Sequence, residues 1–149
     1  ELGSDPVDCL KTMKSSSDYQ SYLIAMPGKL MTNIYEEYGS RLLEQNVRSF
    51  LQARGNVNKG IINTLKEEPE MFFAYNNGIT ATASEIEFDN SKPNGVLKIK
   101  SIKNLQIVNG GQTTASMYYA KTHFDIDLSK IFVQMKLFVQ PHFHQDMYI

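Results

Sequence analysis

The chain has 149 residues, of which 42% are hydrophobic and 21% charged, as in a soluble globular domain that can bury a core. The formal net charge of -1 argues against a strongly basic nucleic-acid binder but permits a local basic patch. No apolar run approaches the roughly 18 residues of a membrane-spanning helix, and the single cysteine excludes an internal disulfide or a cysteine-based zinc site. We therefore expect a cytoplasmic protein without membrane contact.

The N-terminal region, residues 1–20, is polar and predicts a loosely ordered lead-in to one domain over residues 21–149. The short apolar stretch "SYLIAM" is bounded by Pro27 and Gly28 and predicts a strand. The chain starts without a secretory signal and stops without a polar tail, so we expect a fragment of a longer protein.

The next part of the chain has the periodicity of helices. Apolar residues recur at every fourth position over residues 28–51, with an interruption at 39–40. Residues 56–68 predict a clearer helix, with Asn56 or Asn58 as its N-cap and Pro69 beyond its end.

The remaining segments alternate between strand and helix patterns. "ITATASEIEF" and "VLKIKSIKNLQIV" predict two strands joined as a hairpin by the polar loop "DNSKPNG". A helix of about three turns follows in "QTTASMYYAKT", and "IFVQMKLFV" alternates as a strand does. The order predicts an α+β (mixed α/β) domain, with helices packed on a central mixed sheet of about four or more strands.

A first candidate site lies where the strand "LQIVN" meets the following helix. The first amide groups of a helix lack intrahelical partners and attract anions, and Gly110 and Gly111 permit close backbone approach. Asn109, Gln112 and Thr113 add polar side chains. The segment lacks the lysine of a Walker loop and the spacing of a dinucleotide fingerprint, so a ligand-contacting loop and a plain turn both stay open.

A second candidate site is the turn in "FFAYNNGITATA". Asn76, Asn77 and Gly78 suit a tight turn, because Asn and Gly tolerate left-handed backbone conformations. The structural alternative is a turn into a strand, with the aromatic residues of 72–75 in the core.

Charged residues also crowd the stretch "RLLEQNVRSFLQARG". Arg41 with Glu44, and Glu44 with Arg48, have the spacing of helix-surface ion pairs. The functional alternative is phosphate contact by an arginine, for which Arg48 is the leading candidate.

Motifs for catalysis or metal binding are sparse. His142, His144 and Asp146 alternate along the chain, but ligand types without closed geometry do not make a metal site, so none is predicted. The sequence contains no G-x-S-x-G, H-E-x-x-H or C-x-x-C pattern, and it assigns neither catalytic residues nor a cofactor.

Four blocks in order resemble the abortive infection phage-resistance (AIPR) family of bacteria. They are "NVRSFL" at 46–51, "VNKGIINTL" at 57–65, "NNGIT" at 76–80 and "QIVNGGQT" at 106–113, within a resemblance that covers about residues 41–120. The resemblance implies a protein of phage defence, associated with restriction–modification loci and usually much longer than this chain.

Three hypotheses for function follow. The leading one is a nucleic-acid or nucleotide-binding domain, because two Asn-Gly turns flank strands that would be neighbours in a sheet. The alternatives are part of a phosphoryl-transfer or nuclease enzyme completed outside this fragment, and a structural interaction module. The residues that we expect to line the polar pocket are Arg48, Asn76, Asn77, Gly78, Asn109, Gly110, Gly111, Gln112 and Thr113.

Overall fold

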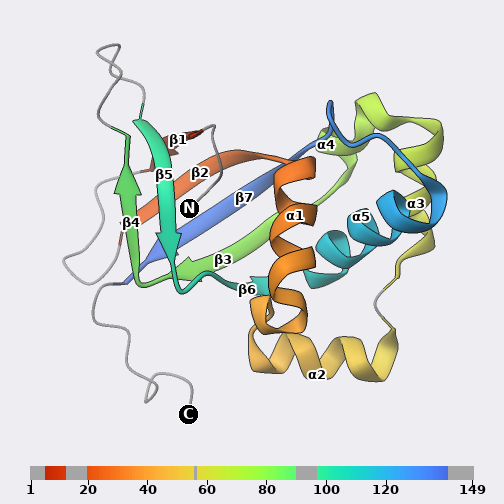
Figure 1. Ribbon diagram of the computed structural model, residues 1–149, viewed down its shortest axis with the longest axis horizontal. Helices are drawn as coiled ribbons and strands as arrows, with labels where there is room; N and C mark the ends of the chain where they lie inside the picture. Colours follow the sequence, from red (N-terminus) through yellow and green to blue (C-terminus); the bar gives the residue numbers. More distant parts are fainter. Residues whose placement is uncertain (1–5, 13–19, 56, 90–96, 141–149) are drawn as a thin grey trace.

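The computed structural model describes residues 6–12, 20–55, 57–89 and 97–140, and their strands form one seven-stranded mixed sheet with helices packed on it (Figure 1). This confirms the predicted α+β class. The strand order is β4-β5-β1-β2-β7-β3-β6. The strands are β1 Val7–Lys11, β2 Gln20–Pro27, β3 Ile79–Ala83, β4 Glu85–Phe88, β5 Leu97–Lys103, β6 Gln106–Asn109 and β7 Phe132–Val139.

The longest pairing in the sheet joins β2 to β7. The two strands run antiparallel over eight residue pairs, from Gln20 opposite Val139 to Pro27 opposite Phe132. On its other side β7 pairs in parallel with β3, and all other named pairs in the described residues are antiparallel. The last strand of the described chain is therefore the middle of three neighbouring strands.

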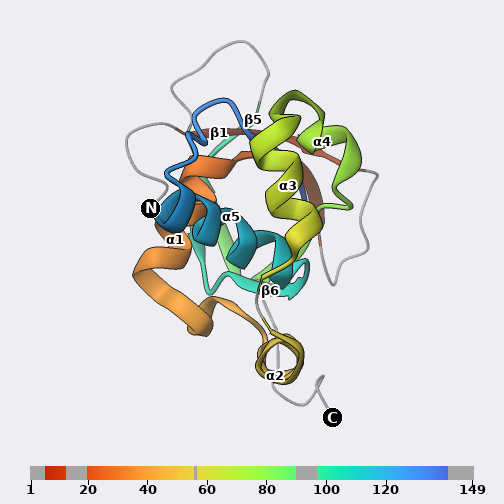
Figure 2. The same cartoon turned by 90° about the vertical axis from the view of Figure 1, so that its right-hand side faces the viewer.

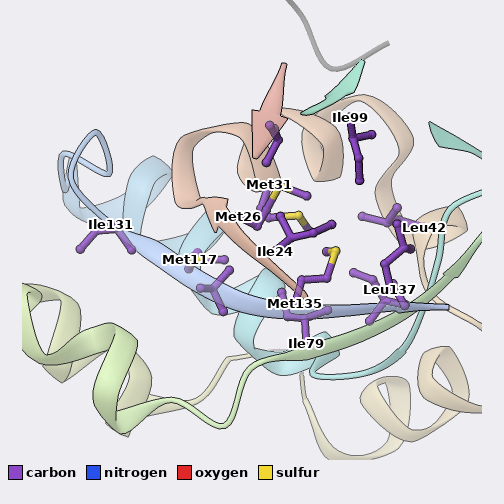
Figure 3. Packing of buried hydrophobic residues seen from close by; sticks show 14 of the residues in the cluster. Ile24, Met26, Met31, Leu42, Ile79, Ile99, Met117, Ile131, Met135 and Leu137 are labelled. Atoms are coloured by element: carbon purple, nitrogen blue, oxygen red, sulfur yellow. The ribbon is translucent and has the colours of Figure 1, made fainter. Parts of the chain in front are cut away.

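Burial in β7 follows the alternation that the sequence predicted. Val133, Met135, Leu137 and Val139 are buried, because successive side chains of a strand point to opposite faces of the sheet. These side chains join a core between the sheet and the helices, in which Met26 of β2 and three further methionines are fully buried. Figure 3 shows Met26, Met31 and Met135 together within this core.

The predicted hairpin forms, but each of its two arms is interrupted and continues as a second strand. Ser84 separates β3 from β4, and Asn104 and Leu105 separate β5 from β6. At the fork the Ser84 amide donates to the Lys103 carbonyl at 3.0 Å, and Asn104 Nδ2 donates to Ser84 Oγ at 2.9 Å. Asn104 adopts φ 58°, a left-handed conformation that Asn tolerates. As a result, one half of the hairpin forms one edge of the sheet and the other half forms the opposite edge.

The expectation of a loosely ordered lead-in over residues 1–20 needs correction at Val7–Lys11. These residues form β1, which pairs with β2 on one side and β5 on the other. Val7 and Cys9 are buried, and this two-residue alternation was too short to stand out in a polar stretch. The rest of that expectation, residues 1–5 and 13–19, lies outside the described residues.

The helices confirm the interruption predicted near residue 39. The first predicted helical stretch contains α1 Gly28–Tyr38, the 3-10 turn η1 Gly39–Leu42 and α2 Gln45–Arg54. The next helix is α3 Lys59–Glu67, and α5 is Gly111–Phe124. Helix α5 contacts both α1 and α3 and lies between them (Figure 2).

The aromatic stretch after α3 is helical and only partly buried. It comprises the 3-10 turn η2 Pro69–Met71 and the short helix α4 Phe72–Tyr75. Phe72 is 1% exposed, whereas Phe73 is 49% and Tyr75 57% exposed. Placing the whole stretch in the core was therefore wrong, because consecutive residues of a helical turn face different directions.

The described helices do not meet the requirements of a bilayer crossing. Across residues 6–12, 20–55, 57–89 and 97–140, none is both long and apolar enough to span a membrane.

Candidate ligand-binding cleft

The two Asn-Gly turns meet at one cleft of about 810 Å³, at the start of α5. Eight of the nine predicted pocket residues line it: Asn76, Asn77, Gly78, Asn109, Gly110, Gly111, Gln112 and Thr113. The turns meet because β3 and β6 are antiparallel neighbours, with Thr80 opposite Asn109, so the start of one strand lies beside the end of the other. The other lining residues are Glu44, Asn46, Val47, Leu51, Asn58, Ile61, Tyr75, Thr80, Val108 and Lys136.

The glycines of the two turns allow close packing of backbone on backbone. Gly110 has φ +89°, and a Cβ there would lie 2.6 Å from the Gly78 carbonyl oxygen. Gly78 has φ +90°, and its Cβ would lie 2.7 Å from the Gln134 carbonyl oxygen. Both glycines are therefore required by the fold, because a side chain at either position would collide with main-chain atoms.

Gly111 has a different role, at the contact between α2 and the first turn of α5. A Cβ on Gly111 would lie 2.8 Å from Val47 Cγ1 and 3.1 Å from Leu51 Cδ1. The apolar residues of α2 thus close one wall of the cleft by packing directly against the glycine.

Asn76 links the two turns through its side chain. Its Oδ1 accepts a hydrogen bond from the Gly78 amide at 2.8 Å, and its Nδ2 donates to Thr113 Oγ1 at 3.2 Å. Thr113 is 6% exposed. These two residues therefore hold β3 and α5 in position, and neither side chain is free to turn wholly toward a ligand.

A third segment, at the start of α3, also reaches the cleft. The sequence predicted Asn58 as one of two possible N-caps, and Asn58 Oδ1 does accept from the Ile61 amide at 3.1 Å. The Asn58 amide donates to Ser116 Oγ of α5 at 2.9 Å, and Asn58 Nδ2 lies 3.5 Å from Gln112 Oε1. No local pattern indicates that this cap lines the cleft, because the contact between Asn58 and Gln112 spans 54 residues.

Three helices present their N-terminal turns to this cleft. Asn46 belongs to the first turn of α2, Ile61 to that of α3 and Gln112 to that of α5. The N-terminus of a helix carries a partial positive charge. Glu44 caps α2 by accepting from the Asn46 amide at 3.0 Å, whereas α5 has no side-chain cap because its N-cap is Gly110. The uncapped end of α5 makes this wall the more favourable one for an anionic group.

The prediction of Arg48 as the cation of the pocket is corrected by its contacts. Arg48 Nε donates to the Ser40 carbonyl at 3.0 Å and Nη2 to the Leu43 carbonyl at 3.1 Å, and Arg48 does not line the cleft. Its guanidinium therefore holds the end of η1 in place. Neither of the predicted ion pairs, Arg41 with Glu44 or Glu44 with Arg48, forms within 4 Å in the described residues.

The cation that does line the cleft is Lys136, on the exposed face of β7. Its place follows from the parallel pairing that sets Lys136 beside Thr80 of β3. The sequence pattern did not predict this position, because strand pairing between residues this far apart cannot be read from local periodicity.

Residues His142, His144 and Asp146 fall outside the described part of the chain. Within the described residues no group of three or more His, Cys, Asp or Glu is placed to hold a metal ion.

The fold and the cleft define an α+β protein in which two polar turns and three helix N-termini meet at one end of a mixed sheet. The chain belongs to the AIPR family, because the sequence model described as "AIPR protein" matches residues 43–148. The match includes all four motif blocks and the whole cleft. Family membership indicates a place in abortive infection and phage defence.

Comparison with individual proteins adds nothing to this assignment. No curated protein and no solved structure matches the chain.

Proposed function

We propose that this AIPR-family domain binds a nucleotide or nucleic acid in the cleft formed by its two Asn-Gly turns. The observation that carries the proposal is the convergence of two turns, 30 residues apart in sequence, on a cavity of about 810 Å³ with a largely polar wall. A cavity of this size is within the range of small-molecule and cofactor sites.

The charges and polar groups of the cleft support this class of ligand. Lys136 has no hydrogen-bond or ion-pair partner among the described residues, so its ammonium group can take a phosphate. The uncapped amides of α5 add donors for an anion. Asn77 and Asn109 are exposed, and their side chains make no hydrogen bond to the described residues, which leaves their carboxamides free for a ligand.

The test is a thermal-shift and calorimetric titration of the purified protein with ATP and with a single-stranded oligonucleotide. A ligand that binds only the folded state raises the melting temperature. We expect Asn77→Ala to weaken binding about fivefold and Lys136→Gln about tenfold, from the loss of one neutral and one charged hydrogen bond. Neither substitution is expected to lower the melting temperature of the free protein, because both side chains are exposed.

Matched controls are available outside the cleft. Asn63→Ala and Lys130→Gln remove an exposed amide and an exposed lysine that do not line the cavity, and they should leave affinity unchanged. Asn76→Ala should instead destabilise the free protein by about 1–2 kcal/mol, because it breaks the link between the turns. The proposal fails if neither ligand shifts the melting temperature, or if the cleft variants bind as the controls do.

A further inference from the structure

The amides that line the cleft point to a more specific ligand, on the assumption that the proposed nucleotide-binding function is correct. Two of them, Asn58 and Asn76, are held by hydrogen bonds to α3, β3 and α5. Gln112 is held only at the limit of hydrogen bonding, 3.5 Å from both of its partners. The six carboxamides of the lining are Asn46, Asn58, Asn76, Asn77, Asn109 and Gln112.

The other three carboxamides are free. Asn46, Asn77 and Asn109 are exposed, and their side chains make no hydrogen bond to any described residue. They come from α2, from the turn before β3 and from the end of β6, so they face the same space from separate walls.

A carboxamide suits a neutral heterocycle better than a phosphate. It carries one acceptor oxygen and two N–H donors, and it pairs with an edge that offers one acceptor and one donor. A phosphate has only acceptors, so it would leave the amide oxygens facing an anion. The charged side chains of the lining are only Glu44 and Lys136, so their formal charges cancel.

An unpaired aromatic ring completes the arrangement. Tyr75 lines the cleft, is 57% exposed, and takes part in no ring contact with the described aromatic residues. It directly precedes Asn76, and the buried Phe72 anchors the same helical turn. Stacking on such a ring contributes about 5- to 100-fold in affinity per base.

We propose that the cleft reads a nucleobase, with Tyr75 stacking on its face and the free carboxamides of Asn77 and Asn109 pairing with its edge. Adenine is the expected base, because its N7 acceptor and N6 donor match one carboxamide in two hydrogen bonds. The sugar and phosphate then extend toward Lys136. The base can belong to a free nucleotide or to an unpaired position of a single strand, since both present the same face and edge.

The experiment compares the affinities of the purified protein for AMP, UMP, ribose 5-phosphate, single-stranded oligo(dA) and the matching duplex. We expect ribose 5-phosphate to bind at least about tenfold more weakly than AMP, since it lacks the stacking and pairing groups. AMP should also bind more tightly than UMP. Binding of AMP alone would identify a free nucleotide as the ligand, and tighter binding of oligo(dA) than of duplex would identify a single strand.

Variants separate stacking from a general change in the fold. Tyr75→Ala should weaken AMP binding about 5- to 100-fold, whereas Tyr75→Phe, which keeps the ring, should stay within about threefold of the parent. Phe73→Ala is the control, because Phe73 is similarly exposed on the same short helix but does not line the cleft.

The possible failures can be told apart. Equal affinity for AMP and ribose 5-phosphate would overturn base reading and leave the nucleotide-binding proposal standing. Equal affinity for AMP and UMP would overturn the preference for adenine, because the N3–H donor and O4 acceptor of uracil can also pair with one carboxamide. Absence of binding by every nucleotide and oligonucleotide would overturn both this inference and the proposed function.

Discussion

Adjacent residues of one motif have separate roles in the cleft. The Asn76 side chain is hydrogen-bonded to Gly78 and Thr113. The side chain of Asn77, the next residue, is exposed and makes no hydrogen bond to the described residues. The glycine beside them is required by backbone packing. The motif "YNNGIT" therefore combines one structural amide with one amide that is available for recognition.

Gly110 gives the sharpest test of this separation at the residue scale. We expect Gly110→Ala to lower the free energy of unfolding by about 2–4 kcal/mol, because the new Cβ is strained at φ +89° and meets the Gly78 carbonyl oxygen at 2.6 Å. Gly55→Ala is the control, since Gly55 has φ +91° but nothing within 4 Å of its Cβ position. Urea unfolding of both variants measures the difference. Equal losses would show that the contact with Gly78 contributes nothing.

Single residues also show where sequence analysis reached its limit. The convergence of the two Asn-Gly turns was predictable, because strand ends carry their turns with them when the strands pair. The cation of the cleft was not predictable. The Arg48 guanidinium donates to two carbonyl groups of the protein, and Lys136 reaches the cleft through a parallel strand pairing across more than 50 residues. The spacing of charged residues along the chain predicts neither the hydrogen bonds of Arg48 nor the strand pairing of Lys136.

At the scale of elements, α5 organises the helical layer. Its buried positions include small residues such as Ala115, Ser116 and Ala120, which let neighbouring helices approach closely. A helix of about three turns after the two glycines was predicted from the sequence, and so was the alternation of β7. The division of the long hairpin was not predicted, because the interruptions of the two strand patterns are short: Ser84 alone in one and Asn104 with Leu105 in the other.

Ser116 of α5 accepts a hydrogen bond from the start of α3. Removal of its hydroxyl should therefore destabilise the start of α3 before other parts of the domain. Ser116→Ala leaves the Asn58 amide without its acceptor, at an expected cost of about 1–3 kcal/mol. We expect hydrogen exchange to accelerate in the first turn of α3 more than in β7. Thr122→Ala is the matched control, because its exposed hydroxyl bonds only within its own helix and to His123. Uniform acceleration across the whole domain would contradict this local role.

At the scale of the whole molecule, the inner strand β1 sets an alkaline limit on stability. Burial, with the charge of Asp8, raises the pKa of the Cys9 thiol to about 11 from its ordinary value of 9.0. Between these values the unfolded chain has released the proton and the folded chain retains it. The free energy of unfolding must therefore fall as pH rises through this window.

The expected slope from Cys9 is about 1 kcal/mol per pH unit between pH 9 and 11. Denaturant unfolding at several pH values should show this slope in the parent protein and a shallower one in Cys9→Ala. Comparing slopes cancels the constant cost of the smaller side chain and the titration of the tyrosines other than Tyr22, whose pKa is raised by burial and by the charge of Cys9. Identical slopes would mean that the thiol stays neutral in both states or ionises equally in both.

The position of β7 also governs when the protein can fold during its synthesis. It is the last strand of the described chain, yet it lies between β2 and β3 and pairs with both. Until Val139 has left the ribosome exit tunnel, the strands on either side of β7 have no partner to join them, and their apolar faces stay accessible to chaperones. The cleft is assembled in the same late step, since Lys136 arrives on β7 and Gly78 packs on Gln134. A nascent chain of this protein therefore gains its fold and its candidate binding site together, after nearly all of the described sequence has been translated.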